Sequence, residues 1–74
     1  MNPTVGRIVR YFPTTTDGLA TPDEGCAALI VKVWSDTMVN LTVFDAAGNA
    51  HPRTSVGQRK EGVTQFCWDW PPRD

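Results

Sequence analysis

The chain has 74 residues, of which 41% are apolar, and its 7 Lys and Arg against 8 Asp and Glu give a net charge of −1. This length allows one small domain, 1–74, whose thin core leaves stability marginal, so we expect a homo-oligomer. The nearly neutral charge argues against general coating of nucleic acid, and no apolar run of about 18 residues predicts a membrane span.

The first predicted element is a short strand from Val5 to Tyr11, in which the side chains alternate between two faces. A long loop, Pro13 to Gly25, follows, because this stretch has turn residues but no sustained apolar period. A loop of about 13 residues in so small a domain is often functional.

The most apolar run, Ala27 to Trp34, predicts the central strand, since β-branched side chains suit a pleated surface. Turn chemistry at 35–37 separates it from a second alternating run, Met38 to Phe44. The two runs therefore predict a hairpin.

A second tight turn, 45–49, leads to a predicted strand from His51 to Val56, in which Pro52 indicates an edge strand or a bulge. A polar turn at 57–62 precedes a last predicted strand, Val63 to Trp68. The tail, 69–74, is expected to leave the sheet because two consecutive prolines cannot continue a ladder.

Five short strands with a long first loop are typical of a small SH3-like barrel, so the predicted fold class is all-β. Closure of the barrel would remove exposed edges that a sheet of this size could not otherwise protect. An open five-stranded sheet completed by a partner chain is the structural alternative. Trp34, Phe66 and Trp68 are expected in the core, and the alternative is that aromatic faces such as those of Trp34 and Trp68 stack on a base.

No catalytic, metal or cofactor site is predicted, and the protein is expected not to be an enzyme. His51 is the only histidine and has no nucleophile motif beside it, while Cys26, His51 and Cys67 lack the close spacing of zinc ligands. In a reducing compartment Cys26 and Cys67 are expected as free thiols, with a disulfide as the alternative.

Binding has better support, because arginines are interleaved with aromatic side chains along the chain. Arginine suits bidentate contacts with phosphate, and an aromatic face can stack on a base. The residues predicted to contact a ligand are Arg10, Tyr11, Arg53, Trp70 and Arg73.

Three segments carry a resemblance to a protein family: P-T-V-G-R-I-V at 3–9, V-N-L-T-V-F at 39–44 and W-D-W-P-P-R at 68–73. Together they resemble small uncharacterised proteins encoded by bacteriophages and prophages, over nearly the whole chain. Arg10 stands where that family has a histidine. The resemblance implies a phage protein acting in the host bacterial cytoplasm, and the start of the chain, which has no apolar stretch of the kind a secretory signal needs, agrees with that expectation.

The leading hypothesis is therefore a phage-encoded binding protein that acts against host defence by sequestering a small nucleotide signal. An alternative is a docking module that binds a host or virion protein through a barrel edge and the Trp-Pro-Pro tail. A second alternative is a nucleic-acid-binding barrel of the Tudor or KOW kind, whose affinity would fall steeply with salt.

Overall fold

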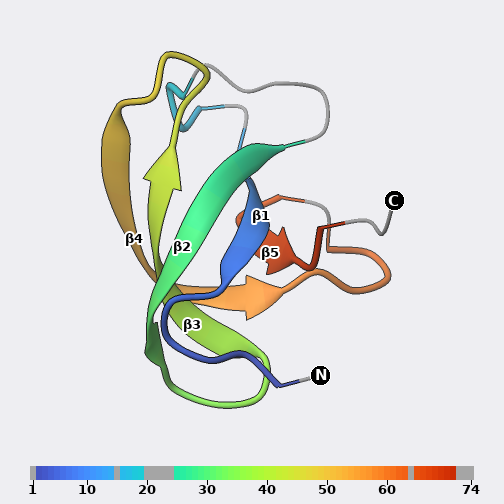
Figure 1. Cartoon of the computed structure of the whole chain (residues 1–74). Helices are drawn as coiled ribbons and strands as arrows, with labels where there is room; N and C mark the ends of the chain where they lie inside the picture. Colours follow the sequence, from blue (N-terminus) through green and yellow to red (C-terminus); the bar gives the residue numbers. More distant parts are fainter. Residues whose placement is uncertain (1, 15, 20–24, 64, 72–74) are drawn as a thin grey trace.

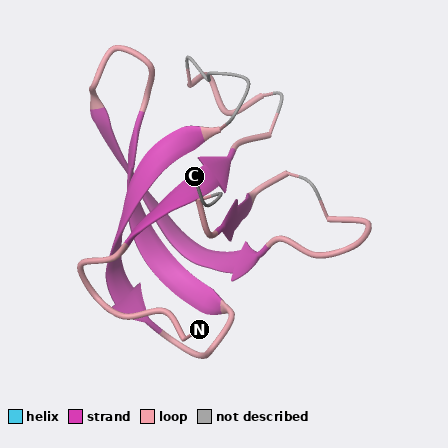
Figure 2. Cartoon of the chain, turned by 45° about the vertical axis from the view of Figure 1, so that its right-hand side comes forward, coloured by secondary structure: helices cyan, strands magenta, loops and turns pink. Residues whose placement is uncertain are grey.

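The computed structural model describes residues 2–14, 16–19, 25–63 and 65–71. Within them the chain forms strands and loops, with no helix (Figure 2). The five strands are β1 (Ile8–Phe12), β2 (Cys26–Val33), β3 (Met38–Phe44), β4 (Ala50–Gln58) and β5 (Cys67–Asp69).

The strands close into a barrel in the order β1-β2-β3-β4-β5 (Figure 1). β1 to β4 pair in sequence as antiparallel neighbours, and β5 returns to pair antiparallel with β1. The barrel closes where β5 also runs parallel to the end of β4, at Gly57 and Gln58. The predicted all-β, five-stranded SH3-like barrel is thus confirmed, with the long first loop between β1 and β2.

The core is made by the side chains that alternate inward from all five strands. On β3, for example, Val39, Leu41 and Val43 are at most 1% exposed, as their spacing predicted. The other members of the core cluster are Val9, Tyr11, Cys26, Ala28, Ile30, Val56 and Trp68. Of the three aromatic residues expected in the core, only Trp68 is there, because Trp34 and Phe66 are 55% and 42% exposed.

The register shifts at two places, at Val31 on β2, between Ile30 and Lys32, and on β4. On β4, Thr54 and Ser55 together oppose the single residue Asn40, since Leu41 pairs with Arg53 and Val39 with Val56. Ser55 adopts the left-handed conformation, with φ of 55°, and its N–H donates to Asn40 Oδ1 at 2.8 Å. This bulge, together with Pro52, bears out the expected irregular strand and leaves a poor template for pairing with another chain.

The first and last strands of the chain are shorter than predicted. β1 begins at Ile8 rather than Val5 because residues 4–7 form a turn, in which Arg7 N–H donates to Thr4 O at 3.2 Å. The last strand begins at Cys67 rather than Val63, because Lys60 and Val63 form an isolated bridge around a tight turn. Residues 60–63 therefore fold back before the chain enters β5.

Both cysteines are free and buried, and they lie on opposite faces of the sheet. Cys26 pairs with Tyr11 and faces the core, whereas Cys67 pairs with the next residue, Phe12, and so points the other way. β1 also lies between their strands, which places their Cα atoms about two strand spacings, or ~9.6 Å, apart. A disulfide needs Cα atoms within about 7 Å, so this fold keeps the thiols apart.

Candidate ligand-binding site

A pocket of about 280 Å³ opens where β3 begins, β4 ends and the connection from β4 to β5 starts. The space over Gly57 is empty, because no atom lies within 4 Å of the position that a Cβ would take there. The pocket is lined by Thr37, Met38, Gly57, Gln58, Arg59, Lys60, Val63 and Phe66.

Backbone hydrogen bonds fix the elements that surround this pocket. The carbonyl of Thr37 accepts from Gln58 N–H at 2.7 Å and from the indole Nε1 of Trp68 at 2.9 Å. The carbonyl of Trp68 in turn accepts from Arg59 N–H at 2.7 Å. The fully buried Trp68 therefore ties the turn before β3 to the end of β4, which gives the pocket a rigid frame.

Phe66 forms one wall of the pocket in an unusual backbone conformation. Its φ is 50°, in the left-handed region, which is uncommon for an aromatic residue and costs it free energy. Its ring contacts Tyr11 edge to face, with centroids 6.2 Å apart, yet 42% of the residue stays exposed. A ring fixed on one side and open on the other can stack on a planar ligand.

Val63, which precedes Phe66 in the chain, is held by two polar contacts. Val63 N–H donates to Lys60 O at 2.9 Å, and the Cys67 thiol points at Val63 O at 3.8 Å. Burial raises the pKa of the Cys67 thiol, while the charge of Arg59 acts in the opposite direction. Cys67 is therefore a neutral packing group under the pocket wall.

Arg59 and Lys60 give the pocket its positive side. Both residues are exposed, and the Arg59 guanidinium lies 5.0 Å from the ring centroid of Phe12, a cation–π contact that orients it. Glu61, also exposed, follows them in the turn. Two cations beside an exposed aromatic ring can hold an anion that carries a planar group.

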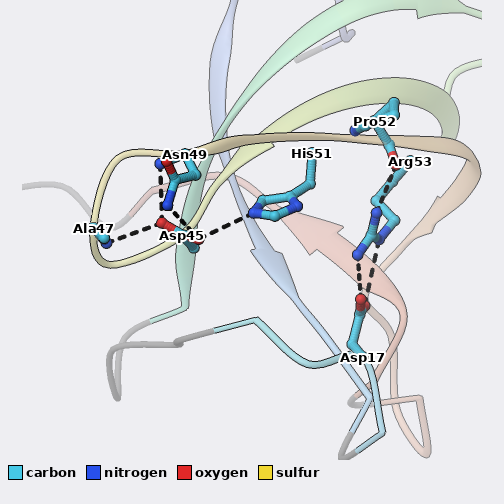
Figure 3. Close-up of polar contacts among 7 residues, drawn as sticks. All are labelled: Asp17, Asp45, Ala47, Asn49, His51, Pro52 and Arg53. Carbon is cyan, nitrogen blue, oxygen red and sulfur yellow. Dashed lines mark hydrogen bonds and ion pairs between the residues drawn. The ribbon is translucent and has the colours of Figure 1, made fainter.

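In a second polar cluster, Asp17, from the connection between β1 and β2, lies beside Arg53 of β4 (Figure 3). Asp17 accepts a hydrogen bond from the Tyr11 hydroxyl at 2.9 Å and forms an ion pair with Arg53. The hydrogen bond from Arg53 is the main reason that the pKa of Asp17 is lowered, and burial is the main reason that the pKa of Tyr11 rises to about 12. This arrangement pins the loop to the barrel.

Asp45 organises the β3–β4 turn next to this cluster. Its carboxylate accepts from the N–H groups of Ala47 and Asn49, both at 2.9 Å, and lies 3.0 Å from His51 Nε2 (Figure 3). These contacts, with the bond to His51 first, lower the pKa of Asp45 to about 2. His51 thus supports a turn.

Of the five residues predicted to contact a ligand, the four that the structure describes do not gather at one site. Tyr11 has no exposed ring face, because the residue is 0% exposed, and Arg53 is paired with Asp17. Trp70 is half-buried, with its ring edge to face on Trp68 at 5.2 Å. Arg73 lies outside the described residues.

Arg10 lines a different hollow, a groove of about 440 Å³ on the outer face of β1 and β2. The small Ala27 pairs with Arg10 on one side and Phe44 on the other, so the larger neighbours form walls above it. Ile8 and Pro71 also line this groove.

The sequence prediction did not include Arg59 and Lys60 in the site, and it placed Phe66 in the core. The available signal was local: two cations in a turn between Gly57 and Gly62, with an aromatic residue close after it. Alternation along a presumed strand directed Phe66 inward instead.

In the part of the chain that the structure describes, no three His, Cys, Asp or Glu side chains gather as a metal site would require. Those same residues contain no helix of the length and apolarity needed to cross a membrane. Comparisons with known protein families, curated proteins and solved structures found no match.

Proposed function

We propose that this protein binds a small nucleotide, without turnover, in the pocket formed by Met38, Arg59, Lys60 and Phe66. The observation that carries the proposal is the position of Phe66. Its side chain is exposed beside two exposed cations, and its backbone is held in a strained conformation. The proposal keeps the ligand class expected from the sequence and moves the site to other residues.

The chemistry of the pocket suits a nucleotide. Arg59 offers a planar fork of donors and Lys60 a compact charge for phosphate oxygens. Stacking of a base on Phe66 would contribute roughly 1–3 kcal/mol. The volume of about 280 Å³ lies just below the usual range for ligand pockets, about 300–1,000 Å³, which favours a ligand no larger than a mononucleotide unit.

The resemblance to phage proteins supplies the biological setting of the proposal. A phage protein that holds a nucleotide signal would weaken host defence in the bacterial cytoplasm, and stoichiometric sequestration needs no catalytic group. We also propose that the protein acts as a homo-oligomer, because a 74-residue domain has little core of its own. Native mass spectrometry measures the number of copies.

Isothermal titration with a panel of linear and cyclic mononucleotides tests the proposed site. Arg59→Gln is expected to weaken binding about tenfold, the effect of losing a charge-assisted hydrogen bond of ~1.5 kcal/mol. Arg10→Gln, the same substitution in the other hollow, is the matched control and should leave affinity unchanged. Flat heats across the panel, or a loss confined to Arg10→Gln, would contradict the proposal.

A second candidate function, docking to a host protein, is favoured by the groove over Ala27. Ile8 at its rim is 61% exposed, and Pro71 and Phe44 add apolar surface. A stoichiometric partner captured from host lysate by the wild type and lost with Ile8→Asp would support docking. Capture that is unchanged by Ile8→Asp would count against this groove.

A further inference from the structure

Trp34 is an exposed aromatic side chain that the structure nevertheless holds in one orientation. The residue is 55% exposed, and its indole Nε1 donates to Asn40 Oδ1 at 2.8 Å. The ammonium of Lys32 lies 3.8 Å from the centroid of its ring. These two contacts fix the orientation of the ring in advance, so stacking of a planar ligand on it would cost less side-chain entropy.

The anchor for Trp34 is Asn40, which lies on β3 opposite the bulge in β4. The same Asn40 oxygen that receives the indole N–H also accepts the backbone N–H of Ser55, whose φ is 55°. The backbone of Trp34 is fixed as well, because its N–H donates to Met38 O at 2.8 Å across the turn. Hydrogen bonds of both the backbone and the side chain therefore hold the Trp34 ring in place.

A row of backbone pairings across the sheet connects Trp34 with the nucleotide pocket. It faces Met38 across the turn, Met38 pairs with Gly57, and Gly57 pairs with Cys67, the residue after Phe66. Met38 and Gly57 both line the pocket. The row from Trp34 to Cys67 therefore crosses about three strand spacings, or ~14 Å measured along the sheet, and Phe66 is the residue next to its far end.

The charges along this row are mostly positive. Lys32 lies at the Trp34 end, and Arg59 and Lys60 lie at the Phe66 end. Asp36, in the turn after Trp34, and Glu61, after Lys60, are the exposed carboxylates beside the row. A ligand that presents negative charge between two planar groups complements this pattern.

We propose that the protein recognises two nucleobases joined by phosphate, one base on Phe66 in the pocket and the second on Trp34. This inference rests on the proposed nucleotide binding and adds the second base. A linear dinucleotide, a cyclic dinucleotide and a single-stranded segment share this chemistry. Because the Lys32 ammonium covers one face of the Trp34 ring, the second base stacks on the opposite face. Lys32 contacts the phosphate nearer to Trp34, and Arg59 contacts the phosphate at the pocket.

Titration of the purified protein with adenosine monophosphate, linear diadenylate, cyclic diadenylate and oligoadenylate tests the inference. The best two-base ligand should bind at least tenfold more tightly than the mononucleotide. Trp34→Ala should remove that advantage and leave mononucleotide affinity unchanged. Trp34→Phe, which keeps a stacking face and loses the indole donor, should retain most of the advantage.

The outcomes separate the inference from the function on which it rests. If the mononucleotide binds and no two-base ligand binds more tightly, or if Trp34→Ala lowers both affinities equally, the second-base site is refuted and the nucleotide pocket stands. If no ligand binds to the folded wild type, both fall. Which two-base ligand binds most tightly distinguishes a free dinucleotide from a strand, and circular dichroism of Trp34→Phe and Trp34→Ala verifies folding.

Discussion

The contact between the Tyr11 hydroxyl and Asp17 leads to a quantitative prediction. Tyr11→Phe leaves the ring in the core and removes only a donor that lies 2.9 Å from a carboxylate. A hydrogen bond to a charged group contributes about 1.5–3 kcal/mol. In the variant the Asp17 carboxylate keeps its ion pair with Arg53, and its side chain is still 10% exposed to water. We therefore expect the free energy of unfolding to fall by about 1–2 kcal/mol.

This loss converts into a measurable shift in the melting temperature. The unfolding entropy of a 74-residue chain is about 0.16 kcal/mol per kelvin, so Tyr11→Phe should lower Tm by roughly 6–13 °C. Thermal unfolding followed by circular dichroism measures it. A double-mutant cycle with Asp17→Asn should give a coupling free energy of similar size.

The pKa shifts of Asp17 and Tyr11 determine how the stability loss caused by Tyr11→Phe depends on pH. The pKa of Asp17 is lowered from its ordinary 3.8, chiefly by Arg53, so its stabilisation is present above pH ~4 and is lost as pH falls through the folded-state pKa. The pKa of Tyr11 is raised from 10.0 to about 12, so its stabilisation is lost as pH rises from about 10 to 12. The difference between wild type and Tyr11→Phe should therefore be largest between pH 4 and 10. A Tm shift below ~2 °C at pH 7, or a coupling free energy near zero, would refute this account of the network.

Two further predictions concern stability and thiol chemistry. Gly25 has φ of 92°, and a Cβ there would lie 2.9 Å from the ring of Phe12, so Gly25→Ala should cost about 2–3 kcal/mol in chemical denaturation. Gly48→Ala, at φ of 89° with nothing within 4 Å, is the matched control and should cost only ~1–2 kcal/mol; equal losses would show that the Phe12 contact is unimportant. Cys26 and Cys67 should react with a thiol reagent only after unfolding and should form no intramolecular disulfide under mild oxidation, and peptide mapping that finds such a bond would contradict the topology.

The candidate site shows how far sequence patterns extend. Arginines and aromatic residues indicated a ligand with phosphate and a planar group, but the pattern selected Tyr11 and Arg53, which the fold uses to fasten the long loop. Tyr11 reaches Asp17 only 6 residues away, whereas Arg53 lies 36 residues from it. A pairing over that separation depends on barrel closure, which no local period encodes.

The sequence by itself determined the strands, because side-chain alternation is a local property: Val39, Leu41 and Val43 had to face one side together, and that side had to be the core. It also determined the tight turns and the irregular β4 strand. Only the tertiary structure decided that Phe66 leaves the strand pattern and opens toward solvent, and that Trp34 lies in the same row as the pocket. The physical reason is that the direction of a side chain in a turn, and the neighbours it meets, are set by which strands the closed sheet brings side by side, through contacts between residues far apart in the chain.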